Sequence, residues 1–308
     1  MLEDQSGRLR LAGDVLRTTH LVTGVIIAAL GTENANGEFE VIDIKVPDLP
    51  RQPSRWERDS NRNESNGGGA SKKIAFVSGL SITGSSSDAL ALELLTDYLL
   101  GCSGPSGEQD ASRISRLIIA GNSIGDPSAA TADSDSENET TPTKKQLPKK
   151  YGYDASAYNP SPTTQLDSFL SEILPSIPVT LMPGGSDPAN FSLPQQGMHR
   201  AMLPRARAYC SNPHPGEGNV EHGWLDNVTN PWEGDVEGWR LWGCSGQNVD
   251  DVLRYLDFTD EDGNVDLEAD EKESRLRILE AMLRWRCAVP TAPDTLCMLL
   301  SFIYQFCS

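Results

Sequence analysis

Three short apolar runs, each followed by a glycine-rich loop, constrain the fold of this chain more than any other feature. They are IAFVS (residues 74–78), RLIIAG (116–121) and IPVTLM (177–182). Segments with helix-forming composition separate them, and residues 88–100 have Asp88 placed as an N-cap and Gly101 as a C-cap. Alternation of strands and helices predicts an α/β fold with a layered sheet.

Further helices are indicated by 3.6-residue apolar spacing. In residues 163–174, Thr164 and Asp167 have the spacing of a capping box. We expect another helix capped by Asn248 and a last one over residues 274–284, with the segment WRLWG (239–243) before them.

The N-terminal part of the chain has a different character. Residues 20–30 are rich in β-branched and small apolar residues, and residues 39–46 follow after a Gly/Asn turn, which predicts two paired strands. We assign residues 1–50 to a partial β unit and 51–72, which are rich in turn formers and charges, to a linker.

The net charge of −18 is concentrated in two stretches. Residues 126–143 hold five acidic groups and no basic ones, within an insertion (126–150) that we expect to be disordered. Residues 259–273 hold eight acidic groups against Lys272 and are predicted to form an acidic loop. Because an acidic chain repels a phosphate backbone, a main role in gripping nucleic acid is disfavoured.

Other composition arguments exclude further classes. The six cysteines contain no CxxC pair, which excludes a zinc knuckle and favours buried free thiols in a reducing compartment. We expect no secretory signal and no membrane span, since no apolar run reaches about 20 residues.

A glycine loop follows each of the three apolar runs 74–78, 116–121 and 177–182. These loops contain two carboxylates, Asp187 and Asp126, and Asp126 already stands at the start of the insertion. Loops at strand ends meet at one edge of an α/β sheet, where ligands bind. None of these loops contains the Lys of a phosphate-binding loop. Two metal ions need a bridging carboxylate and several imidazoles, and Asp187 with Asn122 cannot supply them. We therefore predict that Asp187 accepts backbone N–H groups in its own turn.

Three motifs resemble a known family. LMPGGSDPANFSLPQQ (181–196), CSGQNVDDVLRYL (244–256) and AVPTAPDTL (288–296) are similar to the B-subunit family of eukaryotic DNA polymerases, in the form found in polymerase delta. The resemblance implies that the N-terminal strands belong to an OB fold. It also implies that residues 73–296 form a calcineurin-like phosphoesterase-type domain.

The resemblance also implies that the phosphoesterase site is degenerate. Active members of the wider fold carry Asp-x-His, Gly-Asp-x-x-Asp and Gly-Asn-His-Asp after the three strands. The matching positions in this chain are Gly79, Ser81, Asn122, Gly125, Gly185, Ser186 and Asp187. We expect no catalytic residue, no metal and no cofactor at these positions.

Histidines and tryptophans are the remaining candidates for binding. For His20, His199, His214 and His222 a surface or capping role is favoured over metal binding. Trp239 and Trp242 are predicted to pack in the core. Trp224 and Trp232 lie in predicted loops and are candidate partner anchors, although packing beneath a loop is the favoured alternative.

The function implied by the resemblance is that of a non-catalytic scaffold subunit in DNA replication and repair in the nucleus. Its partners would be the cysteine-rich C-terminal module of the polymerase delta catalytic subunit and the third subunit of the complex, with DNA reached only indirectly. An active metal-dependent phosphodiesterase or nuclease, and a B subunit of polymerase alpha or epsilon, are the alternatives. We expect the family to have more sequence before residue 1, and we expect the apolar tail 297–308 to be atypical and prone to aggregation.

Overall fold

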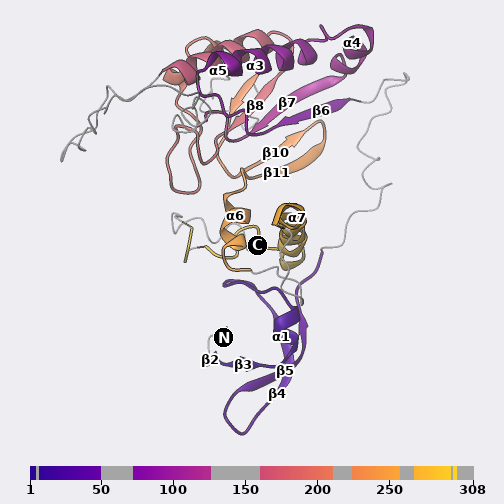
Figure 1. Ribbon diagram of the computed structural model, residues 1–308, viewed down its shortest axis with the longest axis vertical. Helices are drawn as coiled ribbons and strands as arrows, with labels where there is room; N and C mark the ends of the chain where they lie inside the picture. The colour runs from indigo at the N-terminus through magenta and orange to yellow at the C-terminus, as the bar shows by residue number, and fades with distance from the viewer. Residues whose placement is uncertain are drawn as a thin grey trace, which may run out of the picture. The chain divides into compact units, whose positions relative to one another are not determined.

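A computed structural model describes residues 1–4, 7–49, 72–125, 160–210, 224–256, 267–292 and 294–296 (Figure 1). Its contacts divide the chain into two compact units. The terminal unit comprises Met1–Gly67 with Gly246–Ser308, and the α/β unit comprises Gly68–Ser245. The domain boundaries at 50, 72 and 296 stay a prediction, and the contacts divide the chain at Gly246 instead.

The α/β unit is built on a parallel four-stranded sheet. Its strands are β6 (Lys73–Val77), β7 (Ile114–Ala120), β8 (Val179–Met182) and β9 (Leu225–Asn227), in that spatial order. In the register, Ile119 lies beside both Val77 and Leu181. The three apolar runs of the sequence are therefore adjacent strands, and their glycine loops meet at one edge of the sheet.

Helices α3 (Ser86–Leu99) and α5 (Ser161–Ile173) cover one face of this sheet, with the shorter α4 (Pro105–Ala111) beside them (Figure 1). The main core lies between helices and sheet. It includes Leu117, Ile119, Leu166, Leu170 and Leu181, all fully buried. Each such side chain stabilises the fold by about 1.5–3 kcal/mol relative to exposure.

The start of α3 differs from the prediction. Ser85 is the N-cap residue and Leu100 the C-cap, so Asp88 and Gly101 do not have the predicted roles. Asp88 lies in the first turn, and its Oδ2 accepts hydrogen bonds from the backbone N–H and the hydroxyl of Thr83, both at 2.7 Å. The carboxylate therefore fastens the preceding loop to the helix instead of capping its backbone.

The predicted capping box of α5 is wrong. The helix begins at Ser161, so Thr164 is already inside it, and the Thr164 hydroxyl donates to the carbonyl of Pro160 at 2.9 Å. The buried Asp167 carboxylate accepts the backbone N–H groups of Arg205 and Ala206. It thereby holds the short 3₁₀ helix η4 (Ala206–Tyr209) against α5.

The other face of the sheet carries a polar row. Arg116 on β7 donates through Nη1 to Thr180 on β8 and to Asp226 on β9, at 3.0 Å in each case. The hairpin of β10 (Trp232–Val236) and β11 (Trp239–Gly243) also belongs to this unit. The prediction that Trp239 and Trp242 pack in the core is wrong, because both side chains are exposed.

The described part of the terminal unit contains two small sheets and the helices α1, α6 and α7. One sheet is formed by β1 (Leu2–Glu3) and β2 (Arg8–Leu9). The other has the strand order β3 (Leu11–Ala12), β5 (Phe39–Lys45), β4 (Ala28–Glu33). Helix α1 (Val15–Thr18) follows β3 in the chain. The first predicted strand, residues 20–30, is confirmed only from Ala28 onward. Helices α6 (Gln247–Leu253) and α7 (Leu267–Trp285) pack through Val252, Ile278 and Met282.

Two expectations in the terminal unit need correction. Helix α7 begins at Leu267, so the end of the predicted acidic loop 259–273 is helical. The N-cap of α6 is Gly246; Asn248 instead donates through Nδ2 to the carbonyl of Ala288 at 2.7 Å.

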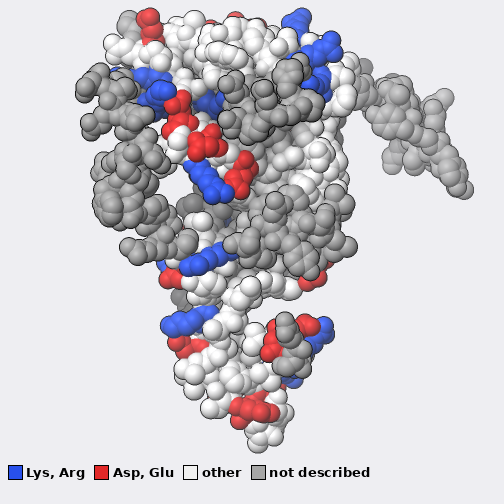
Figure 2. All heavy atoms as spheres, turned by 180° about the vertical axis from the view of Figure 1, so that it is seen from behind, with Lys and Arg blue, Asp and Glu red and all other residues white. Residues whose placement is uncertain are grey.

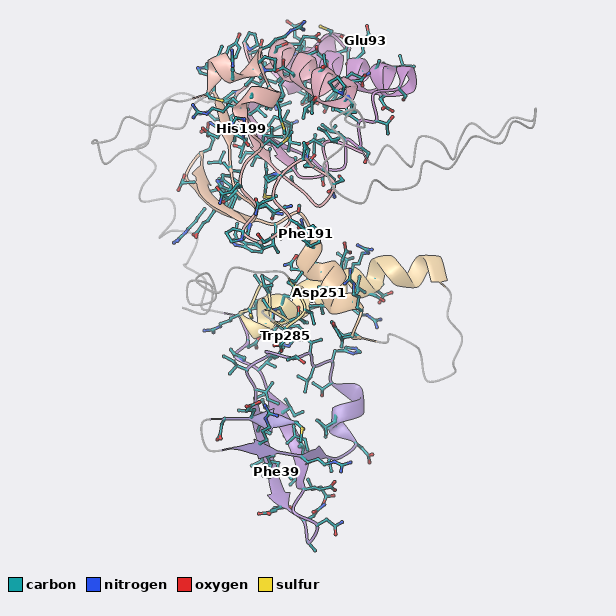
Figure 3. All side chains as sticks on the ribbon, turned by 90° about the vertical axis from the view of Figure 1, so that its left-hand side faces the viewer. Phe39, Glu93, Phe191, His199, Asp251 and Trp285 are labelled. Atoms are coloured by element: carbon teal, nitrogen blue, oxygen red, sulfur yellow. The ribbon has the colours of Figure 1, made fainter. Side chains whose placement is uncertain are left out.

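The AVPTAPDTL motif is held by one buried carboxylate, Asp251 of α6, which is labelled in Figure 3. Its Oδ2 accepts hydrogen bonds from the hydroxyls of Thr291 and Thr295. The threonines of the motif therefore tie the chain after α7 back to α6.

Several expectations lie outside the described residues: the linker 51–71, the insertion 126–150, the tail 297–308, and His214 and His222. Of the six cysteines, Cys102, Cys210, Cys244 and Cys287 are described; Cys102 is exposed and the other three are half-buried, so these four are not buried as predicted. Within the described ranges, no helix is sufficiently long and apolar to cross a membrane.

Candidate functional site

The loops after β6 and β7 are joined by backbone hydrogen bonds at the edge of the sheet. The N–H groups of Gly79, Ser81 and Ile82 donate to carbonyls of residues 121–123 at 3.0–3.1 Å. We call residues 79–82, 121–125 and 184–187 the rim. The backbone N–H groups of Gly79, Ser81 and Ile82 are therefore bonded to the neighbouring loop and do not face a ligand.

Asp187 connects two parts of the rim. Its Oδ1 accepts the N–H of Ile124 at 2.8 Å and its Oδ2 accepts the N–H of Gly184 at 2.7 Å. The residue is only 6% exposed. Burial raises the pKa of its carboxyl, and the hydrogen bonds from Ile124 and Gly184 oppose that effect. The predicted bond within its own turn is present, and a second bond reaches a separate loop.

The side chain of Asn122 bonds to the turn 184–187, which also contains Asp187. The backbone of Asn122 is in the left-handed region at φ 56°, and its Oδ1 accepts from both the N–H and the hydroxyl of Ser186 at 3.2 Å. A Cβ at Gly184 would lie 2.4 Å from the Asn122 backbone nitrogen, so only glycine permits this approach. The two loops are thus in direct contact, and the acceptor atom of Asn122 is engaged.

Sequence reasoning missed a buried amide pair behind the rim. Asn230 donates through Nδ2 to Gln195 Oε1 at 2.8 Å and to Ser245 Oγ at 2.7 Å. Gln195 in turn donates through Nε2 to the carbonyl of Gly184 at 3.2 Å. The Asn-Pro dipeptide after β9 was the available signal, since such dipeptides mark turns.

The predicted positions all lie in the rim: Gly79, Ser81, Asn122, Gly125, Gly185, Ser186 and Asp187. Among the residues that the structure describes, no group of three His, Cys, Asp or Glu side chains could hold a metal ion. His199 accepts the N–H of Ala201 through Nδ1 at 3.2 Å, which confirms a capping role (Figure 3). Trp224 is exposed, whereas Trp232 is half-buried on β10.

On the face drawn in Figure 2, basic and acidic side chains lie interspersed. Ion pairs of the α/β unit include Lys72–Glu237 at 2.8 Å and Lys73–Asp110 at 2.7 Å.

Comparison with known proteins decides the family. Residues 74–307 match the family model of the DNA polymerase alpha/epsilon B subunit. The chain belongs to this family. Residues 1–44 match the DNA polymerase delta subunit OB-fold domain, which agrees with the predicted N-terminal OB fold. The first match also includes residues 297–307, so the tail does not fall outside the family's range as expected.

Members of the family from distant organisms are similar along almost the whole chain. The DNA polymerase delta small subunit of Oryza sativa is 36% identical over 307 residues, with 96% of this chain and 57% of the relative covered. The small subunit of Saccharomyces cerevisiae is 34% identical, covering 55% of its length. DNA polymerase delta subunit 2 of Drosophila melanogaster is 30% identical, covering 57%. The chain thus spans little more than half of these relatives.

Proposed function

We propose that this chain is a non-catalytic accessory subunit of a nuclear DNA polymerase delta complex. It would join the cysteine-rich C-terminal module of the catalytic subunit to the third subunit and reach DNA only through the complex. The names of the similar proteins support membership in such a complex. Membership in the B-subunit family supports an accessory role in DNA replication.

The observation that carries the non-catalytic assignment is the state of Asp187. Both of its carboxylate oxygens accept backbone N–H groups, and the side chain is buried. A pair of metal ions needs a bridging carboxylate with free lone pairs and several imidazoles. At the remaining predicted positions the rim has glycine, serine and Asn122, whose Oδ1 accepts from Ser186. The residues present do not fit a metal pair, and we derive no metal-dependent step.

Hydrolysis of a phosphodiester tests this assignment. We expect the full chain to cleave bis-p-nitrophenyl phosphate no faster than buffer with manganese or magnesium. Asp187→Ala and Asn122→Gly are the informative variants, and the second keeps the left-handed backbone accessible. Manganese-dependent cleavage that either variant abolishes would establish the alternative, an active phosphodiesterase.

Assembly is a separate test. The full chain should co-purify with the C-terminal cysteine-rich module of a polymerase delta catalytic subunit and with the third subunit when all three are co-expressed. The variant Asn122→Gly, assembled in the same way, shows whether the rim takes part in these contacts. Failure of the folded chain to bind either partner would contradict the scaffold role.

A further inference from the structure

The outer side of α3 carries an apolar stripe. Leu90, Leu94 and Tyr98 are 61%, 61% and 52% exposed. Their spacing of four residues places them on one side of the helix. Leu99, which is buried, and Leu95 face the core on the opposite side. A surface helix normally has one apolar face, turned to the core, and a polar face turned outward. Helix α3 has a second apolar face, which does not pack against the core of its unit.

The charged residues that helices α3, α4 and α5 themselves carry all have one sign; basic side chains from other segments reach Asp110 of α4 and Ser168 of α5. Helices α3, α4 and α5 contain no Lys or Arg. At 100° per residue, Glu93 and Asp97 lie directly along the stripe. Glu108 on α4 and Glu172 on α5 are also exposed. Figure 3 shows Glu93 on the outer side of the helix layer, away from the sheet.

Helix α7 offers a comparison within the same chain. It also has an exposed leucine stripe, which comprises Leu276, Leu279 and Leu283. There, however, the bordering charges are neutralised by the pairs Glu273–Arg277 at 2.6 Å and Glu280–Arg284 at 2.8 Å. The two stripes have similar apolar character, and the charge at their borders distinguishes them.

We propose that the α3 face (Leu90, Leu94 and Tyr98 with Glu93 and Asp97) is a docking site for an amphipathic helix of a protein partner whose apolar stripe is bordered by Lys or Arg. The apolar stripe supplies the contact area, as in helix-in-groove recognition. The acidic border selects a cationic partner and repels an acidic one. The proposal adds a binding surface to the proposed scaffold role. It rests on that role only in assuming that a protein partner exists.

A defined peptide tests the proposal without any polymerase subunit. The probe is a helical peptide of Leu and Lys with leucine on one face, and its matched control has Glu in place of every Lys. Binding to the full chain is measured by fluorescence anisotropy. The variants are Leu90→Gln with Leu94→Gln on α3, and Leu276→Gln with Leu283→Gln on α7. Glutamine keeps helix propensity, and far-ultraviolet circular dichroism checks folding.

We expect the Leu/Lys peptide to bind the unmodified chain and the α7 variant equally well. The α3 variant should bind it about tenfold more weakly, as loss of a buried anchor does. Glu93→Gln with Asp97→Asn should also weaken binding and reduce its salt dependence. No binding of the Leu/Lys peptide, equal binding of the Leu/Glu peptide, or equal loss in the α3 and α7 variants would each overturn the proposal. Because no subunit is present, these outcomes are independent of the assembly test.

Discussion

Replacing Asp187 by alanine should destabilise the α/β unit, because its carboxylate is a buried hydrogen-bond acceptor. The change leaves the N–H groups of Ile124 and Gly184 without their acceptors in a buried place. Each buried unsatisfied group costs about 1–3 kcal/mol. Release of a carboxylate whose pKa burial has raised offsets part of that cost. We therefore expect a net loss of about 2–4 kcal/mol in the free energy of unfolding.

Thermal unfolding followed by calorimetry measures this loss. For a unit of this size, about 1 kcal/mol corresponds to about 2–4 °C, so the transition should fall by about 4–16 °C. Asp187→Asn keeps one acceptor oxygen and should lose less. Asp97→Ala removes an exposed carboxylate and should stay within about 0.5 kcal/mol. If Asp187→Ala unfolds at the temperature of the unmodified chain, the rim is not held by this side chain.

Three other predictions concern pH, an ion pair and a glycine. Because the pKa of Asp187 is raised in the fold, its contribution to stability is complete below its unfolded pKa near 3.8 and is lost as the pH rises through the folded pKa. Urea titrations from about pH 4 upward should show this decrease, and Asp187→Asn should remove it. Arg116→Ala should lower the free energy of unfolding by about 3 kcal/mol, because Asp226 remains as a nearly buried charge. A loss below about 1 kcal/mol would show that this ion pair contributes no more than an exposed surface pair does. Gly24→Ala should reduce the melting temperature of the terminal unit, since its φ is +89° and a Cβ would lie 1.8 Å from the carbonyl oxygen of Pro290; unchanged melting would contradict that contact.

Local patterns predicted the α/β fold and the strands β6, β7 and β8, because each of these is a short apolar run followed by a glycine loop. Strand β9, with the sequence LDN, was not predicted. Contacts between distant residues could not be predicted in this way. Asp187 was expected to bind its own turn, which Gly184 confirms, but Ile124 is 63 residues away and no local pattern encodes that bond. The Thr164–Asp167 pair had the spacing of a capping box. Asp167 instead satisfies the N–H groups of a different segment.

The candidate site was predictable in its membership but not in its connections. The resemblance identified the rim positions by their place after each strand. It could not show that the amide of Asn122 bonds to Ser186, or that Gln195 and Asn230 support the loop from behind. Trp239 and Trp242 were assigned to the core from residue type alone, and a two-stranded hairpin leaves both side chains largely in water.

The terminal unit is assembled from the two ends of the sequence, and this dictates an order of events during synthesis. Val22, Val25 and Val46 pack against a cluster that includes Val252 and Ile278. All residues of the α/β unit lie between those two groups in the chain. At a translation rate of about 5–20 residues per second, the N-terminal strands leave the ribosome at least about ten seconds before their partners exist. The α/β unit can fold during that interval, whereas Val22, Val25 and Val46 must wait with their apolar side chains uncovered, so a chaperone that binds them would protect the nascent chain.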